Sequence, residues 1–304
     1  MVPTDWAALS DALLVAAILG YIAAMTLHAA EIIRSPPALV LVGADAPAAL
    51  AVTRSVRSFT GTAAVVTTAA AVAIHVGCVA TRGFAADRIP LGNMYEFVIS
   101  AALAGALAWL VLLLGGRERH LGLFATLAVA VLLGVAGTRL HTRVAPLVPA
   151  LDSPWLRIHV ASAATASDLF MIGFLAAVLY LLRLRHDAAG EPGSTTIGRL
   201  PGADRLDRLA QRMHIIAFPI WTFAVGTGAI WAESAWGRYW AWDPKETWAF
   251  ISWVVYAAYL HARNTAGWRG RRAAAISVLA WITMMINLFA VNLLADGLHS
   301  YAGL

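Results

Sequence analysis

Long apolar stretches separated by short polar segments make up most of this chain of 304 residues. A bilayer core about 30 Å thick requires roughly 20 mostly apolar residues for each helical span. Eight stretches meet this requirement, although the seventh does so only when its Trp and Tyr are counted as apolar. The pattern predicts an all-α, polytopic bundle of about eight transmembrane helices in a single membrane domain, residues 1–304. The predicted spans are 7–33, 59–80, 95–114, 121–140, 155–182, 215–231, 247–262 and 273–294.

Basic residues are unevenly distributed over the predicted loops. Fifteen of the 22 Lys and Arg fall in alternate loops, beginning with the loop after the first span, and seven fall in the others. Because Lys and Arg concentrate in cytoplasmic loops, the first set is expected inside and both termini outside. The first six residues carry no basic residue, so the first apolar stretch is expected to be a retained span rather than a signal peptide.

The composition agrees with a membrane protein and excludes several classes of function. Hydrophobic residues make up 60% and charged residues 13%, against about 45–50% and about 25% in soluble domains. Topology accounts for the net charge of +5, so no nucleic-acid partner is expected. The single cysteine, Cys78, excludes an internal disulfide and a Cys-based zinc site, and is expected to pack. The polar stretch 183–213 is expected to be a flexible cytoplasmic loop, with 204–212 as a short surface helix.

Tryptophan is concentrated in one predicted outer loop, residues 231–246. Six of the twelve Trp lie within 23 residues, and Trp236, Trp240 and Trp242 occur with Tyr239 in seven residues. Trp and Tyr favour the headgroup level, which accounts for a Trp at a helix end such as Trp231. A headgroup belt spreads its aromatics over many helix ends. The cluster therefore indicates a broad, π-rich surface that can hold a large flat ligand.

The residues after this cluster predict a helix start. Asp243 is suited to be the N-cap, Pro244 the first helical residue, and Glu246 the third residue of a capping box. Asn93 and Glu96 have similar spacing at the start of the third span.

Two cations, Arg238 and Lys245, belong to the same loop. Either could meet an anionic group on the edge of a ligand. Anchoring at the headgroup level is the alternative, and the sequence does not decide between the two roles.

Five histidines are expected to be solvated or to join helices rather than to bind a ligand. His120, His186 and His214 lie in or beside the predicted cytoplasmic loops and are expected to be solvated. His28 and His75 lie within spans and are expected to form hydrogen bonds between helices.

An acid, Asp168, lies near the middle of the fifth predicted span, where an unpaired carboxylate is costly. It is expected to hydrogen-bond to Thr165, to Ser167 or to a neighbouring helix. A proton-relay role has no support in the sequence.

Two other histidines are expected at the outer face, on the side of the tryptophan loop. His159 lies about one turn into the fifth span, and His299 follows the eighth. Two neutral imidazoles flanking an aromatic platform provide the axial ligands of a six-coordinate haem iron. For each alone, a hydrogen-bonded interfacial role is the alternative. His261 lies ~22 Å of helix from Glu246, near the cytoplasmic side.

These segments resemble the haem-handling membrane proteins of cytochrome c maturation, specifically the CcsA (ResC) family of the system II pathway. Actinobacterial members of that family are often called CcsB. The WWD segment of the family is matched by WAESAWGRYWAWDPKETWAF, residues 231–250. Further matches are PLGNMYEF at 90–97, WLRIHV at 155–160, YLHAR at 259–263 and residues 291–301, so the resemblance covers most of the chain in order.

The resemblance implies haem b as the cofactor, with His159 and His299 as external axial ligands of its iron. It implies that His261 is the intramembrane histidine that handles haem near the cytoplasmic entrance. It assigns no catalytic residue. The implied haem-binding residues of the WWD segment are Trp236, Gly237, Trp240, Trp242 and Asp243.

The implied function is that of the haem-handling subunit of a system II cytochrome c synthase, in the plasma membrane. Such a subunit carries haem b across the membrane and presents it at the outer face for thioether attachment to the CxxCH segment of apocytochrome c. The implied partners are a CcsB/ResB-type membrane subunit, apocytochrome c and a thioredoxin-like thiol reductant. The chain is thus expected to act within a holocytochrome c synthase complex. The alternatives are a haem exporter or chaperone of the CcmC type without attachment activity, and a purely structural scaffold.

Overall fold

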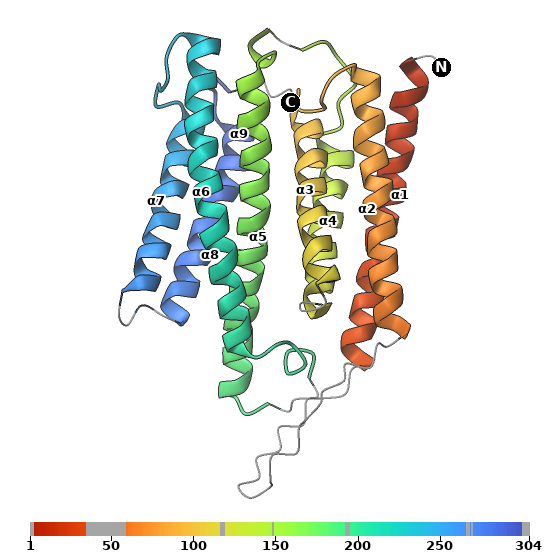
Figure 1. Ribbon diagram of the computed structural model, residues 1–304, viewed down its shortest axis with the longest axis vertical. Coiled ribbons are helices and arrows are strands. Elements are labelled where there is room, and N and C mark those ends of the chain that lie inside the picture. The colour runs from red at the N-terminus through yellow and green to blue at the C-terminus, as the bar shows by residue number, and fades with distance from the viewer. Residues whose placement is uncertain are drawn as a thin grey trace, which may run out of the picture.

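The computed structural model describes residues 3–34, 59–115, 119–147, 149–191, 195–265, 268 and 270–299. Within these ranges the chain forms eight long helices and no strand (Figure 1). The eighth helix continues through a π-helical turn, η3 (Ile286–Ala290), into the short α9 (Val291–Leu294). The others are α1 (Pro3–Arg34), α2 (Phe59–Ala86), α3 (Met94–Leu114), α4 (Gly122–Arg139), α5 (Pro154–Ala188), α6 (Ala203–Trp236), α7 (Pro244–Asn264) and α8 (Arg271–Met285), with single turns at η1 (Arg119–Leu121) and η2 (Pro149–Leu151).

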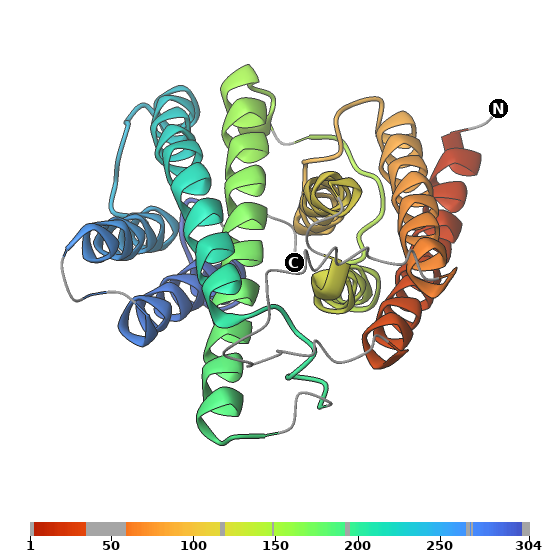
Figure 2. The ribbon, with the colours of Figure 1, turned by 60° about the horizontal axis from the view of Figure 1, so that its bottom comes forward.

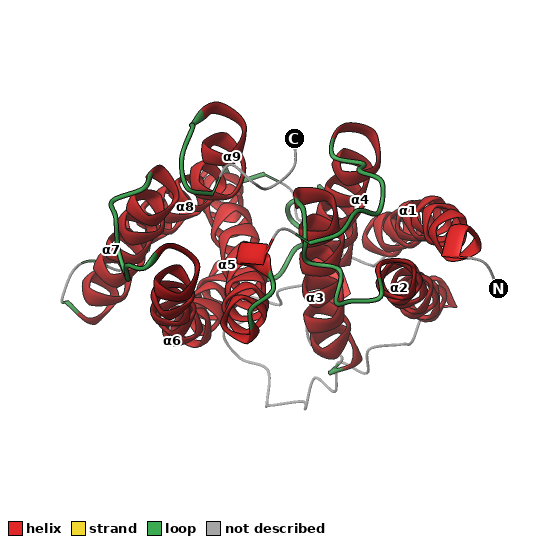
Figure 3. Ribbon diagram, turned by 90° about the horizontal axis from the view of Figure 1, so that it is seen from above, coloured by secondary structure: helices red, strands yellow, loops and turns green. Residues whose placement is uncertain are grey.

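Seven of the described helices are long and apolar enough to cross a membrane. The exception is α7, whose 21 residues include Lys245, Glu246, His261 and Arg263. It nevertheless lies in the bundle beside α8 (Figure 3). The predicted polytopic helical bundle is therefore confirmed, and its weakest predicted span is the one that falls short. The start of α1 and the end of α9 lie at the same end of the bundle (Figure 1).

The helices form two groups, α1–α4 and α5–α9, which meet where α3 packs on α5 (Figure 3). Trp109 and Leu113 of α3 belong to the same buried cluster as Ile172 of α5. In the second group Phe170 stacks on Tyr256, with ring centroids 3.5 Å apart. Figure 2 shows the long pair α5 (green) and α6 (teal) side by side between the two outer sets of helices.

The loop within the polar stretch 183–213 is shorter than the sequence predicted. The helices α5 and α6 extend into it from either side, so residues 204–212 are the start of α6 rather than a separate surface helix. The described part of the remaining connection is held against α5. Arg183 donates hydrogen bonds to the carbonyl oxygens of Gly198 (2.9 Å) and Leu200 (2.7 Å).

Two histidines that were expected in solvent are buried, so that expectation was wrong. His214 is fully buried, because α6 carries it between helices. Its Nδ1 donates to the carbonyl of Ala210, and its Nε2 lies 3.1 Å from the Ser277 hydroxyl. His186 is 4% exposed, with Nε2 2.6 Å from the Thr195 hydroxyl. The side chain of His120 lies outside the described residues.

The histidines predicted to join helices do so. His28 Nε2 lies 3.2 Å from the Thr68 hydroxyl, which links α1 to α2. His75 contacts the Tyr21 hydroxyl (3.2 Å) and the carbonyl of Ile99 (3.0 Å). These contacts pair His28 Nε2 and both ring nitrogens of His75, which would be costly to leave unpaired within the apolar interior.

The buried acid of the fifth span does not pair with its own helix. The hydroxyls of Thr165 and Ser167 donate to backbone carbonyls one turn earlier. Asp168 instead lies against α3, where a Cβ on Gly105 would be 2.8 Å from Asp168 Oδ1. The backbone of Gly105 is its hydrogen-bond partner, so the neighbouring helix is the correct one of the expected partners, and Oδ2 has no hydrogen-bond partner among the described residues.

A glycine contact against His214 gives a test of this packing. A Cβ on Gly173 of α5 would lie 2.4 Å from Cε1 of the buried His214 ring. We expect Gly173→Ala to destabilise the protein by about 1–3 kcal/mol, because the interior cannot accept the added carbon without a shift. Thermal unfolding in detergent should show a lower Tm. The control is Gly134→Ala, whose Cβ would meet nothing within 4 Å, and an unchanged Tm in Gly173→Ala would contradict the packing.

Candidate functional site

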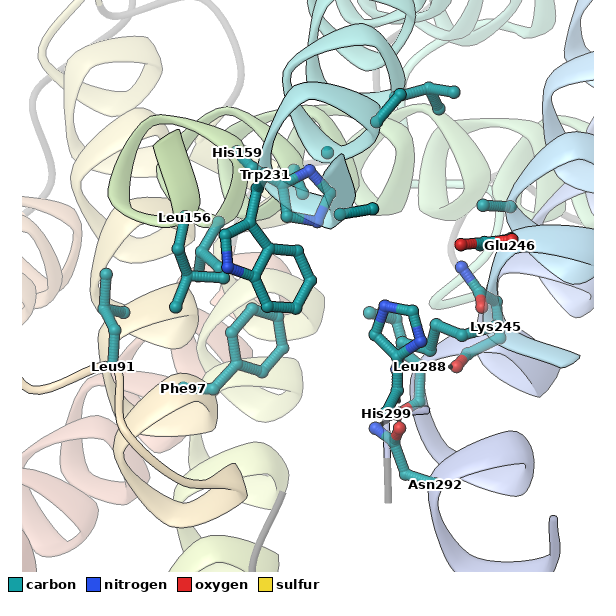
Figure 4. A pocket seen from close by; sticks show the side chains of 18 of the residues that line it. Leu91, Phe97, Leu156, His159, Trp231, Lys245, Glu246, Leu288, Asn292 and His299 are labelled. Atoms are coloured by element: carbon teal, nitrogen blue, oxygen red, sulfur yellow. Dashed lines mark hydrogen bonds between the residues drawn. The ribbon is translucent and has the colours of Figure 1, made fainter. Parts of the chain in front are cut away.

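A cavity lies between the two helix groups, where the residues before and at the start of α3 face residues of α5 to α9. The space between its walls, with the open solvent at its mouth, is about 1150 Å³. In Figure 4, His159 and Trp231 lie on one side of it, and Lys245 and His299 on the other. Concave apolar sites with a few polar groups are typical of small-molecule and cofactor binding. The apolar lining includes Leu91, Phe97, Leu156, Trp221, Trp231 and Leu288.

His159 projects into the cavity from the first turns of α5. Its Nδ1 donates a hydrogen bond of 2.8 Å to the carbonyl oxygen of Ala224 on α6. Its ring is parallel to the Trp231 indole, with centroids 6.3 Å apart and an angle of 10° between planes. Because a carbonyl only accepts, the proton is on Nδ1, and a neutral ring then carries its lone pair on Nε2.

His299 reaches the same cavity from the segment after α9. Its Nδ1 donates to Asp243 Oδ2 at 2.8 Å, which again leaves the lone pair on Nε2. The ring contacts two indoles edge-on, Trp231 at 5.7 Å and Trp236 at 5.0 Å between centroids. Burial lowers the pKa of His299 to about 4, although the Asp243 carboxylate opposes the shift. The ring is therefore neutral at pH 7.

Asp243 connects the start of α7 to the segment that carries His299. It is the N-cap, and with Glu246 it forms the predicted capping box, which is confirmed. Its Oδ2 accepts from the backbone of Lys245 (3.1 Å), and its Oδ1 from the backbone of Leu298 (2.6 Å). Burial acts to raise the pKa of Asp243, but the hydrogen bonds from Leu298 and His299 outweigh it, so the pKa lies below its ordinary value.

The tryptophan-rich segment divides into residues at the cavity and residues outside it. Trp240 lines the cavity, and Trp236, the last residue of α6, contacts His299. Trp242 is 67% exposed and packs edge-on against Trp240 at 5.7 Å. Its φ of +57° is uncommon for a bulky residue and turns the chain toward Asp243. Gly237 caps the end of α6 with φ +71°, where a glycine carries no steric penalty.

His261 is not at this cavity. It lies near the opposite end of α7 from Asp243, and its side chain is exposed. It shares one exposed stripe of that helix with Phe250, Val254 and Ala258, which follow one another at helical spacing.

The loop before α3, which supplies Leu91 to the cavity wall, is held by a buried ion cluster. The Glu96 carboxylate is fully buried and accepts from Arg82 (3.2 Å) and Arg88 (2.6 Å). As predicted from its spacing, Asn93 caps α3, with Oδ1 2.9 Å from the Glu96 backbone nitrogen.

Sequence reasoning named Lys245 as one of two cations that could meet an anionic group of a ligand, but it missed the two asparagines that contact Lys245 in the cavity wall. Lys245 Nζ donates to Asn292 Oδ1 at 2.7 Å and to the carbonyl oxygen of Asn287 at 3.1 Å. Asn287 lies in the π-helical turn η3, a feature often found at functional sites. The apolar sequence of α8 carries no signal for such a turn, so these asparagines could not be placed in advance.

Comparison with known families gives one match that covers most of the chain. Residues 91–299 match the family described as "Cytochrome C assembly protein". The matched region begins at Leu91 and ends at His299, so it contains both imidazoles and the tryptophan-rich segment.

Curated relatives carry the name "Cytochrome c biogenesis protein CcsA". The one from Gloeobacter violaceus is 33% identical over 287 residues, covering 75% of this chain and 82% of the relative. The one from Guillardia theta is 41% identical over 176 residues, covering 53% and 58%. The one from Parasynechococcus marenigrum is 36% identical over 251 residues, covering 72% and 80%.

A solved structure titled "Cytochrome c Heme Lyase CcmF" has a similar fold. The TM-score is 0.57 at 18% sequence identity, and the match covers 95% of this chain and 47% of that chain. This chain therefore spans about half the length of that protein.

Proposed function

Because this chain belongs to the cytochrome c assembly protein family, we propose that its cavity holds haem b during the biogenesis of c-type cytochromes. One observation carries the proposal. His159 and His299, 140 positions apart in the sequence, line one cavity, and each is held in the tautomer that offers Nε2 as a ligand. Two neutral imidazoles are a suitable axial pair for haem iron, and hydrogen bonds at Nδ1 orient such ligands.

The walls of the cavity suit a porphyrin in shape and polarity. Indole rings such as Trp231 and Trp240, with aliphatic side chains such as Leu156 and Leu288, offer broad apolar surfaces. The same cavity thus provides the two imidazoles and the apolar surface that the proposal requires.

The finer function that we propose is presentation of haem for attachment to apocytochrome c. A thioether forms when a cysteine S–H adds across a haem vinyl group, with the sulfur bonded to one carbon and the hydrogen to the other. No oxidant is consumed. Cys78, the single cysteine of the chain, is fully buried and does not line the cavity. The contribution of this chain is therefore positioning and ligation, while a thioredoxin-like reductant would keep the client thiols reduced.

We propose that His261 receives haem at the other end of α7, before the cargo reaches the outer-face cavity. Its exposed ring makes no hydrogen bond with the described residues and lies on an exposed stripe of the helix. A CcsB/ResB-type subunit that covers this stripe would supply the missing side of the site.

A haem exporter or chaperone of the CcmC type is the second candidate, since the same cavity would serve it. Reconstitution of the purified protein with its partner subunit, haem and reduced apocytochrome c separates the two. Attachment activity yields haem that resists acidic acetone extraction, whereas export or chaperoning alone yields extractable haem. A protein that stays colourless when purified from haem-replete cells, and gains no Soret band with added haem, would contradict both.

The close approach of α6 to His159 provides a direct test of that ligand. A Cβ on Gly228 would lie 2.7 Å from Cε1 and Nδ1 of His159. We expect Gly228→Ala to displace the ring and lower haem affinity by roughly tenfold, as loss of a ligand's orienting contacts does. Pyridine haemochrome assays of haem per protein measure the effect.

The control for this substitution lies two residues away on the same helix. A Cβ on Gly226 would meet nothing within 4 Å, so Gly226→Ala should leave haem occupancy unchanged. Equal occupancy in the two variants would count against His159 as a ligand.

A further inference from the structure

One cation faces the cavity. Among the described residues that line it, Lys245 is the only Lys or Arg, and the rest of the wall is mostly apolar. Lys245 extends from the first turn of α7, across the cavity from Trp231 (Figure 4). Arg238, the other cation of the same segment, is exposed and does not line the cavity.

The Nζ of Lys245 is held by neutral oxygens, and burial lowers the pKa of Lys245 to about 7. Its two hydrogen bonds go to the Asn292 side chain and the Asn287 backbone, and an ammonium has three hydrogens to donate. Within the described part of the chain it forms no ion pair. The neighbouring acids are engaged elsewhere: Asp243 accepts from His299 and two backbone groups, and Glu246 from the backbone of Ala241 (2.8 Å) and Asp243.

A second unsatisfied group lies beside the ammonium. Asn287 is 3% exposed and lines the cavity, and its Oδ1 has no hydrogen-bond partner among the described residues. The oxygen and nitrogen of such an amide can exchange places on rotation, so the group can also present its NH₂ to a ligand. The Lys245 Nζ and an amide donor then line the same cavity wall, and a bound carboxylate would favour the charged form of Lys245.

We propose that Lys245 and Asn287 form an anion subsite that binds a propionate carboxylate of the haem. Asn292 holds Lys245 in place through its Oδ1, while its amide group donates to the Leu288 carbonyl and to the Met94 sulfur. The inference rests on the proposed function, because it takes haem as the occupant. The propionates are the only charged groups at the porphyrin edge, and an ammonium pairs with a carboxylate through charge-assisted hydrogen bonds. Such a contact also restores the counter-charge that Lys245 lacks in this structure.

The subsite fixes the rotation of the porphyrin within the cavity. In haem b the two propionates lie on one edge and the vinyl groups on the remaining rings. A propionate held at Lys245 therefore turns the vinyl carbons away from the α7 wall. Axial ligation alone leaves the porphyrin free to rotate about the iron–nitrogen axis, so this contact adds what His159 and His299 do not supply.

Esterified haem tests the subsite, because haemin dimethyl ester keeps the iron and loses both carboxylates. Full-length protein in detergent is titrated with haemin and with the dimethyl ester, and the ratio of the two Kd values is measured. We expect the unsubstituted protein to bind haemin about tenfold more tightly than the ester. In Lys245→Met the preference should disappear, with ester affinity and the six-coordinate spectrum unchanged. Lys245→Arg should retain the preference, and Arg238→Met should match the unsubstituted protein.

Three outcomes would overturn the proposal, and they are distinguishable. A Lys245→Met protein that still prefers haemin shows that another group recognises the carboxylates. One that loses affinity for haemin and ester equally shows that Lys245 only holds the wall together. Failure of the unsubstituted protein to bind either compound removes the proposed haem function itself.

Discussion

His299→Ala and His159→Ala are each expected to lower cytochrome c assembly by more than about a hundredfold and to abolish the six-coordinate haem spectrum. Each substitution removes one of the two proposed Nε2 ligands, and loss of a contact that merely orients a metal ligand already costs about 10–100-fold. Assembly is measured as covalent haem on a co-expressed cytochrome c, and ligation by the visible spectrum of the purified variant.

Added imidazole distinguishes lost ligation from misfolding. The space vacated by either alanine can admit a free imidazole, so assembly and the six-coordinate spectrum should be partly restored. His141→Ala is the matched control, because that ring pairs with Asp11 on an exposed surface (3.1 Å) and does not line the cavity. Full assembly in both ligand variants would refute their assignment.

Asp243→Asn is expected to lower haem affinity by about 10–100-fold while the protein stays folded. The asparagine oxygen can still cap α7, but its NH₂ group can donate to His299 Nδ1 where the carboxylate accepts. The ring would then carry its proton on Nε2, the atom required by the iron. Titration with haemin measures the loss, and unchanged affinity would show that Asp243 serves only as a cap.

The same variant has a distinct pH signature. The pKa of Asp243 is lowered in the folded protein, so the charged carboxylate stabilises the fold above its ordinary pKa of 3.8. That contribution is lost as the pH falls through the lower folded value. The difference in Tm between the unsubstituted protein and Asp243→Asn should therefore be largest near neutral pH and shrink in acid. A constant difference across this range would contradict ionisation of Asp243 as its source.

The sequence predicted the helices well because the requirement for apolar spans is strict, but it predicted their ends poorly. Hydropathy locates the part of a helix that faces lipid, and α5 and α6 continue past that part. His214 was assigned to solvent for this reason, although it is buried between helices. Capping at Asn93 and Asp243 was predictable because its signal is local, within four residues.

The candidate site was partly predictable for a similar reason. Topology alone places His159 and His299 at one end of the bundle, and both line the cavity. Trp242 belongs to the same tryptophan-rich segment but does not line the cavity. Its backbone φ is positive, and its side chain is largely exposed. The contact of Lys245 with Asn292 depends on how α8 and α9 are offset by η3, and that offset has no local signal.

The bridge from Asp243 to Leu298 and His299 has a consequence for the order of events during synthesis. A ribosome makes His299 only after all eight long helices, so a nascent chain that has just inserted α7 has an N-cap but no second imidazole. The tryptophan residues of the cavity wall are thus synthesised before His299, the second of the two proposed ligands. Under the proposed function, a chain arrested before the final helix lacks one of the two proposed iron ligands and is expected to lose haem on purification.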